Sequence, residues 1–420
     1  MNNNTLKSKT VFYYGLIGIP IAFLGFPLYI YLPTFYVETI GLNIAHVGLV
    51  LFMARLIDMI ADPFIGQFSN KCCSRYKLIM ISTIFVLIGI YFLVKPLYFT
   101  PLWLFIFSII TYVSYSLILI PYLTLNAELS NNSYDNTKLS FSREIFIIVG
   151  VLVALIVPYL FDVSENPQKS LEILLYILIF IFPLFVIISK VNIKEPEKII
   201  EKNNKRFLKS LKLFFKNFPN QRKIFLAFLI NNIANALPAT LFLIFVKYVL
   251  DLEKQTGLFL LVYFFSAIIT FPFWLKVSAN LGKKNTWILS MIISSFAFVF
   301  VVLLEEKAFL AFCMICIFTG MCLGADMAIP SSIQSDISQE SKKLGNDISA
   351  VLFGFWAMIT KFALAFSVAI SFICLDMSNY TKDNMEGNTI YTIIFLYSIL
   401  PVLLKITAIF ILTKYDEKIQ

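Results

Sequence analysis

Long runs of apolar residues follow one another along almost the whole chain, separated by short polar stretches. A helix satisfies its own backbone hydrogen bonds in lipid, and it needs about 20 apolar residues to cross a bilayer. The runs therefore predict an all-α, polytopic membrane protein with twelve transmembrane helices. The predicted spans are 11–37, 43–68, 78–96, 100–126, 140–162, 171–190, 223–250, 256–276, 285–304, 307–334, 347–374 and 388–413.

One polar connection is much longer than the others and divides the spans into two groups of six. We predict a six-helix bundle at 1–190, a cytoplasmic basic linker at 191–222 and a second six-helix bundle at 223–420. The plainer interpretation of the linker is a solvated segment whose KRFLKSLKLFFK stretch lies amphipathically on the membrane surface. A phosphate- or lipid-binding site is the alternative.

The composition agrees with a membrane setting. Hydrophobic residues make up 59% of the chain and charged residues 14%, with a mean hydropathy of +0.83. Soluble globular chains carry about 25% charged residues. These values argue against a soluble enzyme and against a disordered chain. No span combines a nucleophile with a base, so we expect no enzymatic activity.

The net charge of +9 would raise the question of nucleic acid in a soluble protein, but cytoplasmic loops of membrane proteins are rich in Lys and Arg. With the N-terminus inside, 24 of the 34 Lys and Arg residues fall on the cytoplasmic side, six outside and four within spans. We therefore predict cytoplasmic termini and no nucleic-acid partner. The expected location is a bacterial inner membrane.

The second span carries three charged residues, Arg55, Asp58 and Asp62. Each charge costs about 2.5–3.5 kcal/mol at the bilayer centre, so the three need a compensating environment. Their spacing puts them on one helical face, where the two carboxylates could surround Na⁺ or share a proton. Pro63 follows and removes one backbone donor. A buried salt bridge from Arg55 to one acid is the alternative, and it leaves the other acid unexplained.

Five further polar residues lie inside predicted spans. Lys361 is too far from either end of its span to reach water, so we expect it to meet an acid. Asp326 is either structural or part of a cavity. Asn231 and Asn235 share a face, which suits helix–helix contact or a hydroxylated ligand. Lys405, in the last span, is expected to be isolated or to extend toward the interface.

Several segments resemble one family. ARLIDMIADPFIG in the second span closely resembles a motif of the glycoside–pentoside–hexuronide:cation symporters, a branch of the major facilitator superfamily. IPYLTL, the segment from Lys138 to Arg143, AIPSSIQSDISQE and ITKFALAF resemble further family segments in the same order. The resemblance covers nearly the whole chain.

The resemblance implies the major-facilitator fold of two six-helix bundles and transport by alternating access. It places Asp58 and Asp62 on the cation-site carboxylates of the family. Arg55 and Arg143 correspond to arginines of the transport cavity, and Lys361 corresponds to a lysine near the cation site.

Two positions depart from the sugar-transporting members, which use carboxylates there to hold sugar hydroxyls. Ala22 and Leu119 stand at these positions. Because apolar side chains accept no hydrogen bonds, the departure argues against a galactoside. Lysolipid symporters resemble the same family, so an amphiphilic cargo stays open.

We therefore expect Na⁺- or H⁺-coupled symport of a small organic solute, with a sugar or glycoside among the candidates. A carrier of lysolipid or another amphiphile, and a non-transporting receptor or scaffold, are the alternatives. We expect a monomer with no cofactor besides the coupling ion. The cation would bind Asp58 and Asp62, and the proposed cavity residues are Arg55, Arg143, Asn231, Asn235, Asp326, Trp356 and Lys361.

Overall fold

The computed structural model describes residues 6–72, 74–130, 132–161, 166–196, 214–216, 218–343, 348–378 and 387–416. Over these ranges the regular structure is helical and contains no strand. The predicted surface helix KRFLKSLKLFFK lies outside the described residues except for its last three positions.

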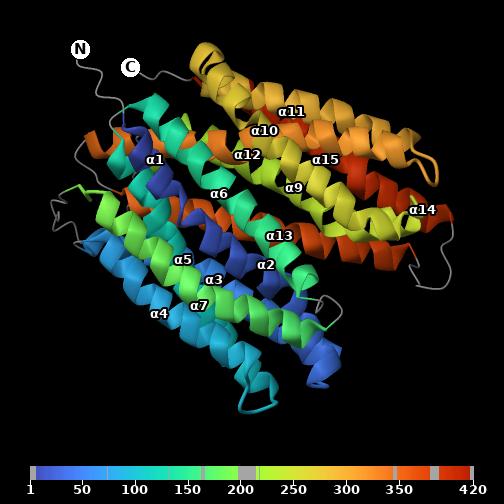
Figure 1. Ribbon diagram of the computed structural model, residues 1–420. Coiled ribbons are helices and arrows are strands. Elements are labelled where there is room, and N and C mark those ends of the chain that lie inside the picture. Colours follow the sequence, from blue (N-terminus) through green and yellow to red (C-terminus); the bar gives the residue numbers. More distant parts are fainter. Residues whose placement is uncertain are drawn as a thin grey trace. The chain divides into compact units, whose positions relative to one another are not determined.

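Most predicted spans correspond to one long helix, whereas the first and the last are each divided into consecutive helices (Figure 1). The helices are α1 (Ser8–Gly15), α2 (Gly18–Thr34), η1 (Phe35–Thr39), α3 (Ile44–Lys71), α4 (Arg75–Val94), α5 (Pro101–Leu129), α6 (Ser133–Leu160), α7 (Pro167–Asn192), α9 (Gln221–Tyr248), η2 (Glu253–Gln255), α10 (Thr256–Leu281), α11 (Lys283–Val299), η3 (Phe300–Leu303), α12 (Phe309–Lys343), α13 (Ser349–Met377), α14 (Gly387–Ile394), η4 (Phe395–Ile399) and α15 (Leu400–Thr413).

Eleven helical segments of the described chain are long and apolar enough to cross a membrane. The predicted second span, α3, is not among the eleven. It is a helix of 28 residues that carries Arg55, Asp58 and Asp62. The prediction of an all-α protein with twelve spanning segments is confirmed.

The internal contacts divide the chain into two units. The first contains residues 1–211 and 334–358, and the second contains residues 212–333 and 359–420. The sequence-based division places 334–358 in the second bundle, whereas these residues contact helices of the first. In particular, the Gln339 amide nitrogen donates to the carbonyl oxygens of Ala127 (2.9 Å) and Ser130 (2.6 Å) at the end of α5.

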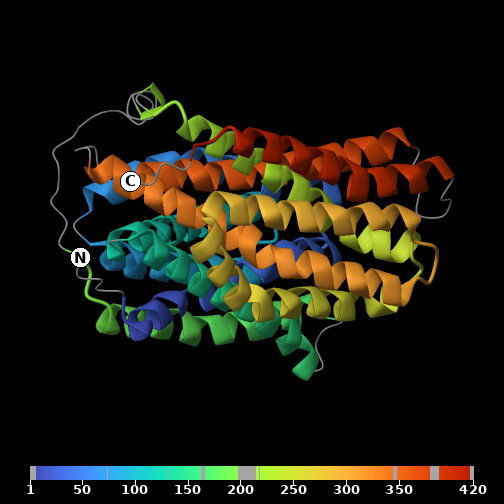
Figure 2. The ribbon, with the colours of Figure 1, turned by 90° about the horizontal axis from the view of Figure 1, so that it is seen from above.

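In the first unit, α3 and α4 pack against α5, and α2 packs against α6 and α7. The helices of this unit run alongside one another (Figure 1 and Figure 2). The contact between α2 and α6 is close, because a Cβ atom on Gly150 would lie 2.5 Å from the Ile19 carbonyl oxygen. Small residues at such crossings let helix backbones approach in a membrane.

In the second unit, α15 packs against α9 and α11 around an apolar core. The rings of Phe245 and Tyr397 are stacked there, with centroids 4.1 Å apart. Each unit therefore has its own helix-packed interior.

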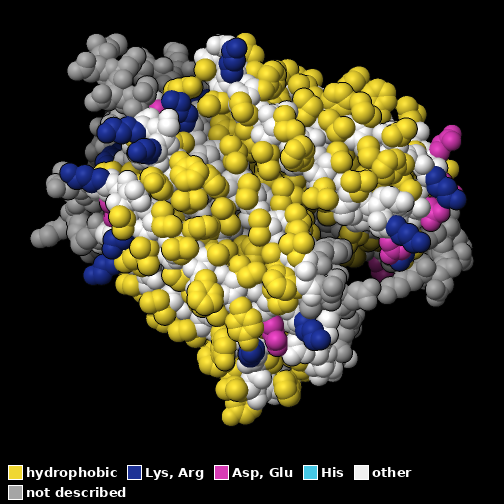
Figure 3. Space-filling view, in the orientation of Figure 1, with side chains coloured by type: hydrophobic (Ala, Val, Ile, Leu, Met, Phe, Trp, Pro, Cys, Tyr) yellow, Lys and Arg dark blue, Asp and Glu magenta, His cyan; other side chains and the backbone are white. Residues whose placement is uncertain are grey.

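Large apolar side chains are also common on the outside of the helices. Phe180 is 76% exposed, Phe265 61% and Phe64 57%. On the face shown in Figure 3, hydrophobic side chains cover most of the surface, and charged side chains lie near its margins. Lipid rather than water is the solvent that suits such a surface.

Candidate cation-binding and transport site

Helix α3 places both acids of the second span inside the first unit. Asp58 is 2% exposed and Asp62 is 0% exposed, whereas their neighbours Ile57 and Phe64 are exposed. The Ser116 hydroxyl, on α5, donates a hydrogen bond to Asp58 Oδ1 at 2.8 Å. The predicted sharing of one helical face by the two carboxylates is therefore confirmed, and that face is buried.

Helix α5 brings an aromatic side chain and a hydroxyl group to the charges of α3. The Arg55 guanidinium lies 4.7 Å from the ring centroid of Tyr112, a distance typical of a cation–π contact. Arg55 is half-buried, whereas Asp58 and Asp62 are buried. Both Arg55 and Asp58 therefore contact side chains of α5.

The beginning of α13 packs directly beside Asp62. A Cβ atom on Gly354 would lie 2.5 Å from the Asp62 carbonyl oxygen, so the backbones of α3 and α13 touch at this point. Gly66 meets the Ala350 carbonyl in the same way one turn further along α3. The predicted cavity residue Trp356 is buried in this part of α13, within the first unit.

Arg143, on α6, is also buried, and its partner is the next residue along the chain. Its Nε (3.0 Å) and Nη2 atoms donate to Glu144 Oε1. Glu144 is 3% exposed, and its second oxygen, Oε2, has no hydrogen-bond partner. The sequence analysis overlooked Glu144, which lies only four residues after the start of the predicted span 140–162 and follows Arg143.

Two tyrosines near Arg143 join α1 to α5. The Tyr14 hydroxyl donates to the Tyr122 carbonyl at 3.1 Å, and the Tyr122 hydroxyl donates to the Tyr14 carbonyl at 2.9 Å. Both hydroxyl groups are fully buried and bonded to backbone. This pair holds two helices together beside the Arg143–Glu144 pair.

In the second unit, Asp326 accepts four hydrogen bonds. Oδ1 accepts from Trp287 Nε1 (3.0 Å) and from the Ser290 hydroxyl (3.3 Å). Oδ2 accepts from Lys405 Nζ (2.8 Å) and from Asn235 Nδ2 (3.2 Å). The donors come from α9, α11 and α15, so this carboxylate connects four helices including its own.

The expectation that Lys405 is isolated or reaches the interface is wrong. Lys405 is 1% exposed, and its ammonium group binds Asp326 and also donates to Asn231 Oδ1 at 3.2 Å. Asn231 and Asn235 share a face as predicted, and both amides bind this ion pair. Lys361 lies in the part of α13 that belongs to the second unit, where it is half-buried.

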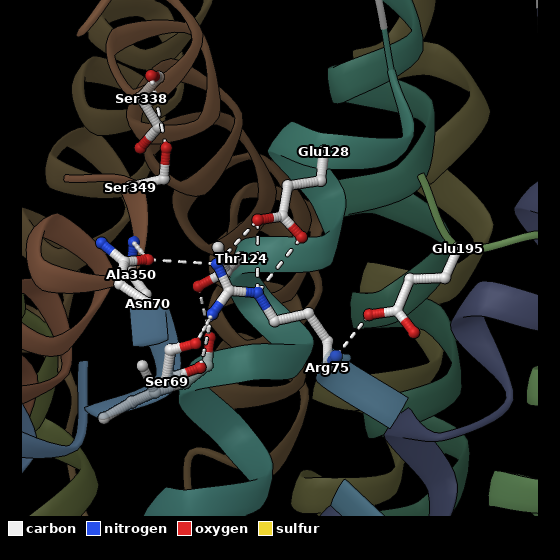
Figure 4. Close-up of polar contacts among 10 residues, drawn as sticks. Ser69, Asn70, Arg75, Thr124, Glu128, Glu195, Ser338, Ser349 and Ala350 are labelled. Carbon is white, nitrogen blue, oxygen red and sulfur yellow. Dashed lines mark hydrogen bonds and ion pairs between the residues drawn. The ribbon is translucent and has the colours of Figure 1, made fainter. Parts of the chain in front are cut away.

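A third buried group of charges lies where α3 ends and α4 begins (Figure 4). Arg75 is 1% exposed, and its Nη2 atom lies 2.7 Å from Glu128 Oε1 of α5. Its guanidinium also donates to the Ser69 hydroxyl (2.7 Å) and to Asn70 Oδ1 (3.1 Å). The sequence showed only a short basic turn here, because Arg75 and Glu128 are 53 positions apart.

Two further contacts extend this group. Glu195, which follows α7, accepts from the Ser74 hydroxyl (2.6 Å) and from the backbone nitrogen of Arg75 at the start of α4. The Ala350 nitrogen, at the start of α13, donates to Asn70 Oδ1 at 3.4 Å. The Arg75 guanidinium is therefore fixed among the ends of several first-unit helices.

The described residues contain no group of three or more His, Cys, Asp or Glu side chains that could hold a metal ion. A site on Asp58 and Asp62 would therefore need other oxygen ligands, and the Ser116 hydroxyl lies within reach of the first acid. Carboxylate and hydroxyl oxygens are the ligands that hard cations prefer.

Charged residues buried among many spanning helices are typical of secondary transporters. The family described as MFS/sugar transport protein matches residues 13–416. The chain belongs to this family. It is an integral, multi-pass membrane transporter, not an enzyme.

Individual relatives agree with this family. The chain is 26% identical over 412 residues to the uncharacterized symporter YnaJ of Bacillus subtilis, with 92% of this chain and 88% of the relative covered. It is 22% identical over 459 residues to sodium-dependent lysophosphatidylcholine symporter 1 of Mus musculus, with 96% of this chain and 85% of the relative covered.

Solved structures show the same fold at low sequence identity. The transporter FucP in the outward conformation matches with a TM-score of 0.74 at 11% identity, over 98% of both chains. A bacterial homologue of the iron transporter ferroportin, in the outward-facing state, matches with a TM-score of 0.70 at 11% identity, over 98% of this chain and 99% of its own. The major-facilitator fold implied by the sequence resemblance is confirmed.

Proposed function

We propose that this protein is a cation-coupled symporter of a small organic solute and that Asp58 and Asp62 bind the cation. The observation that carries the proposal is the burial of two carboxylates on one face of α3. Asp58 is 2% exposed and Asp62 is 0% exposed, and the Ser116 hydroxyl of α5 donates to Asp58 Oδ1 at 2.8 Å. Two carboxylates buried about one helical turn apart, with a hydroxyl beside them, favour the binding of one monovalent cation.

Coupling follows if the cation binds one conformation better than another. A ligand shifts a conformational equilibrium only by its differential affinity for the two states. Asp58 lies on α3, whose backbone touches α13 at Asp62, so a movement of these helices changes the carboxylate site. Binding of the cation would then stabilise the conformation that accepts the solute.

Na⁺ is the first candidate for the coupling ion. The lysophosphatidylcholine symporters among the relatives are named as sodium-dependent. The resemblance of the α3 motif to the glycoside–pentoside–hexuronide:cation symporters supports coupling to a cation and does not choose between Na⁺ and a proton. A proton is the alternative, because two neighbouring carboxylates also favour proton binding.

The cargo has two candidates. The family description favours a sugar or glycoside. A lysolipid is the second candidate, because relatives named as lysophosphatidylcholine symporters match most of the chain. Ala22 is buried and Leu119 is half-buried, and neither offers a hydrogen-bond acceptor to a sugar hydroxyl.

The charge distribution of the connections supports a cytoplasmic location for both termini, since 24 of the 34 Lys and Arg residues then fall inside. We further propose that the membrane is a bacterial inner (plasma) membrane, in keeping with the Bacillus subtilis relative, and that the protein acts as a monomer.

The test is uptake by proteoliposomes that contain the purified protein, with and without an inward Na⁺ or proton gradient. Labelled sugars, glycosides and lysophosphatidylcholine are the substrates. We expect gradient-dependent uptake of one class, lost in Asp58→Asn and in Asp62→Asn. Glu253→Gln, which removes an exposed acid at the start of η2, is the matched control and should transport normally. Undiminished uptake by both Asp variants would contradict the proposal.

A further inference from the structure

The end of α12 carries buried polar atoms that make no hydrogen bond within the described part of the chain. Gln334 is 0% exposed, and neither its amide nitrogen Nε2 nor its amide oxygen Oε1 has a partner among the described residues. The Ser338 hydroxyl, four residues later, is also 0% exposed and has no partner there. Because buried polar groups are nearly always hydrogen-bonded, these three neighbouring atoms indicate a ligand or internal water.

The two amides that the sequence connected with helix contact or a hydroxylated ligand are bonded within the protein. Asn235 Nδ2 donates to Asp326, and Asn231 Oδ1 accepts from Lys405. Gln334 differs from both, because neither end of its amide is used in this way. The recognition of hydroxyl groups is therefore better assigned to Gln334 than to the asparagines.

We propose that Gln334 and Ser338 bind hydroxyl groups of a neutral sugar, the solute of the symporter. An amide offers both a donor and an acceptor, and so does a hydroxyl. At positions i and i+4 of a helix, the two side chains are neighbours and can bind adjacent hydroxyl groups of one sugar ring. This inference rests on the proposed function and chooses between its two cargo candidates.

The face of α12 that carries the pair is polar and uncharged. Gln334, Ser338 and Ser341 share it by their spacing, and all three are buried. Asp336 points elsewhere, since it accepts hydrogen bonds from two side chains of α6. Amide and hydroxyl groups match a neutral sugar, whereas the headgroup of lysophosphatidylcholine carries two opposite charges that need charged partners when they are buried.

The start of α13 connects this pair to the helix of the cation site. The Ser349 hydroxyl donates to the Ser338 carbonyl oxygen at 3.4 Å (Figure 4). A Cβ atom on Gly354 would lie 2.5 Å from the Asp62 carbonyl oxygen. Ser349 and Gly354 are five residues apart, which is about 7.5 Å along the helix. A short segment of α13 within the first unit therefore contacts both α3 and the end of α12.

A purely structural role of the pair predicts a different pattern. If the amide and the hydroxyl bind only internal water, their removal changes the stability of the protein and leaves its sugar affinity unchanged. If they bind the solute, apolar replacements weaken sugar binding. The stability of the sugar-free protein should then not fall, because no hydrogen bond within the protein is broken.

The experiment is equilibrium binding of radioactive D-glucose, D-xylose and D-galactose to the full-length protein in detergent and Na⁺ buffer, with lysophosphatidylcholine tested alongside. We expect wild type to bind at least one of the sugars. Gln334→Met keeps the length of the side chain and removes both polar atoms, so it should weaken that affinity about tenfold or more. Ser338→Ala should weaken it about threefold to tenfold. The melting temperature without sugar should not fall in either variant.

Ser371→Ala is the matched control for Ser338→Ala. The Ser371 hydroxyl is also buried without a hydrogen-bond partner among the described residues, but it lies in the second unit, about 33 Å from Ser349 along α13. Its removal should leave sugar affinity unchanged. If Gln334→Met does not fold, Ser338→Ala against Ser371→Ala still decides the outcome.

Three results overturn the inference: unchanged sugar affinity in the Gln334 and Ser338 variants, an equal loss in Ser371→Ala, or a wild type that binds none of the three sugars. The proposed function survives each of them if gradient-dependent uptake of lysophosphatidylcholine or another solute is lost in Asp58→Asn and Asp62→Asn. No gradient-dependent uptake of any substrate by wild type overturns both.

Discussion

The two units of this transporter bury charge in different ways. In the first unit, α3 carries two buried acids on one face, Asp58 and Asp62, and the Ser116 hydroxyl donates to Asp58. In the second unit, Asp326 and Lys405 form a neutral pair, and Asp326 accepts four hydrogen bonds. The first arrangement has capacity for a cation, whereas in the second the carboxylate is already fully hydrogen-bonded.

The difference shows that burial of a charge inside a span does not by itself identify a transport site. A neutral, fully hydrogen-bonded pair connects helices and fixes their packing. A net charge instead requires a mobile counter-ion, which a symporter obtains from solution. We therefore interpret Asp326, Asn231 and Asn235 as residues that hold α9, α11, α12 and α15 together.

The largest expected effect concerns the neutral pair of the second unit. Lys405→Met leaves the Asp326 carboxylate buried without its counter-ion, which should cost about 3–5 kcal/mol of stability. The melting temperature of the purified protein measures the loss. The double variant Asp326→Leu/Lys405→Met should recover much of it, and a double variant less stable than the single one would contradict the structural role.

A smaller effect is expected at the cation site. Ser116→Ala removes a hydrogen bond to the Asp58 carboxylate, and such bonds to charged groups contribute about 1.5–3 kcal/mol. Na⁺ affinity should also fall, because the Ser116 hydroxyl is a candidate oxygen ligand of the cation.

Ser108, on the same helix, is the control, since its hydroxyl is buried without a hydrogen-bond partner. Ser108→Ala should therefore be nearly neutral in thermal unfolding. Equal losses in both serine variants would show that the Ser116 bond has no special role.

The contact between α3 and α13 is tested by Gly354→Ala. The added methyl group would lie 2.5 Å from the Asp62 carbonyl oxygen, so the helices must separate, at a cost of about 1–3 kcal/mol. The melting temperature and the Na⁺ affinity should both fall. Gly257→Ala in α10 meets no neighbouring atom within 4 Å and should change neither.

The smallest effect is expected for the tyrosine pair that joins α1 to α5. Tyr14→Phe removes one hydroxyl–carbonyl bond, which contributes about 0.5–1.5 kcal/mol. Tyr391→Phe, at a side chain that is 73% exposed, should have no measurable effect on the melting temperature. A larger loss for Tyr391→Phe than for Tyr14→Phe is the result that the structure excludes.

Much of the fold could be predicted from the hydrophobic pattern, because lipid requires every span to be a long apolar helix. The charge pattern of α3 also predicted the buried face that Asp58 and Asp62 share. The pairing of distant charges could not be predicted in this way. Arg75 with Glu128 and Asp326 with Lys405 are joined by packing of separate helices, and nothing in the local sequence identifies the partner.

The contacts of residues 334–358 could not be predicted for the same reason. The hydrophobic run of α12 gives no sign that its end contacts the start of α6, where Asn136 Nδ2 donates to Asp336 Oδ1 at 2.7 Å. Glu144 was overlooked because its adjacent Arg143 was interpreted alone. A buried charged residue is therefore better interpreted together with the charged residues next to it in the sequence than alone.

The central claim is that the two buried acids of α3, and not the neutral pair of the second unit, bind the coupling cation. Equilibrium binding of radioactive Na⁺ to the purified protein tests it most directly. The account predicts one Na⁺ per molecule in wild type and in folded Lys405→Met, and none in Asp58→Asn or Asp62→Asn. Binding that survives in both Asp variants, or that is lost in folded Lys405→Met, would contradict it.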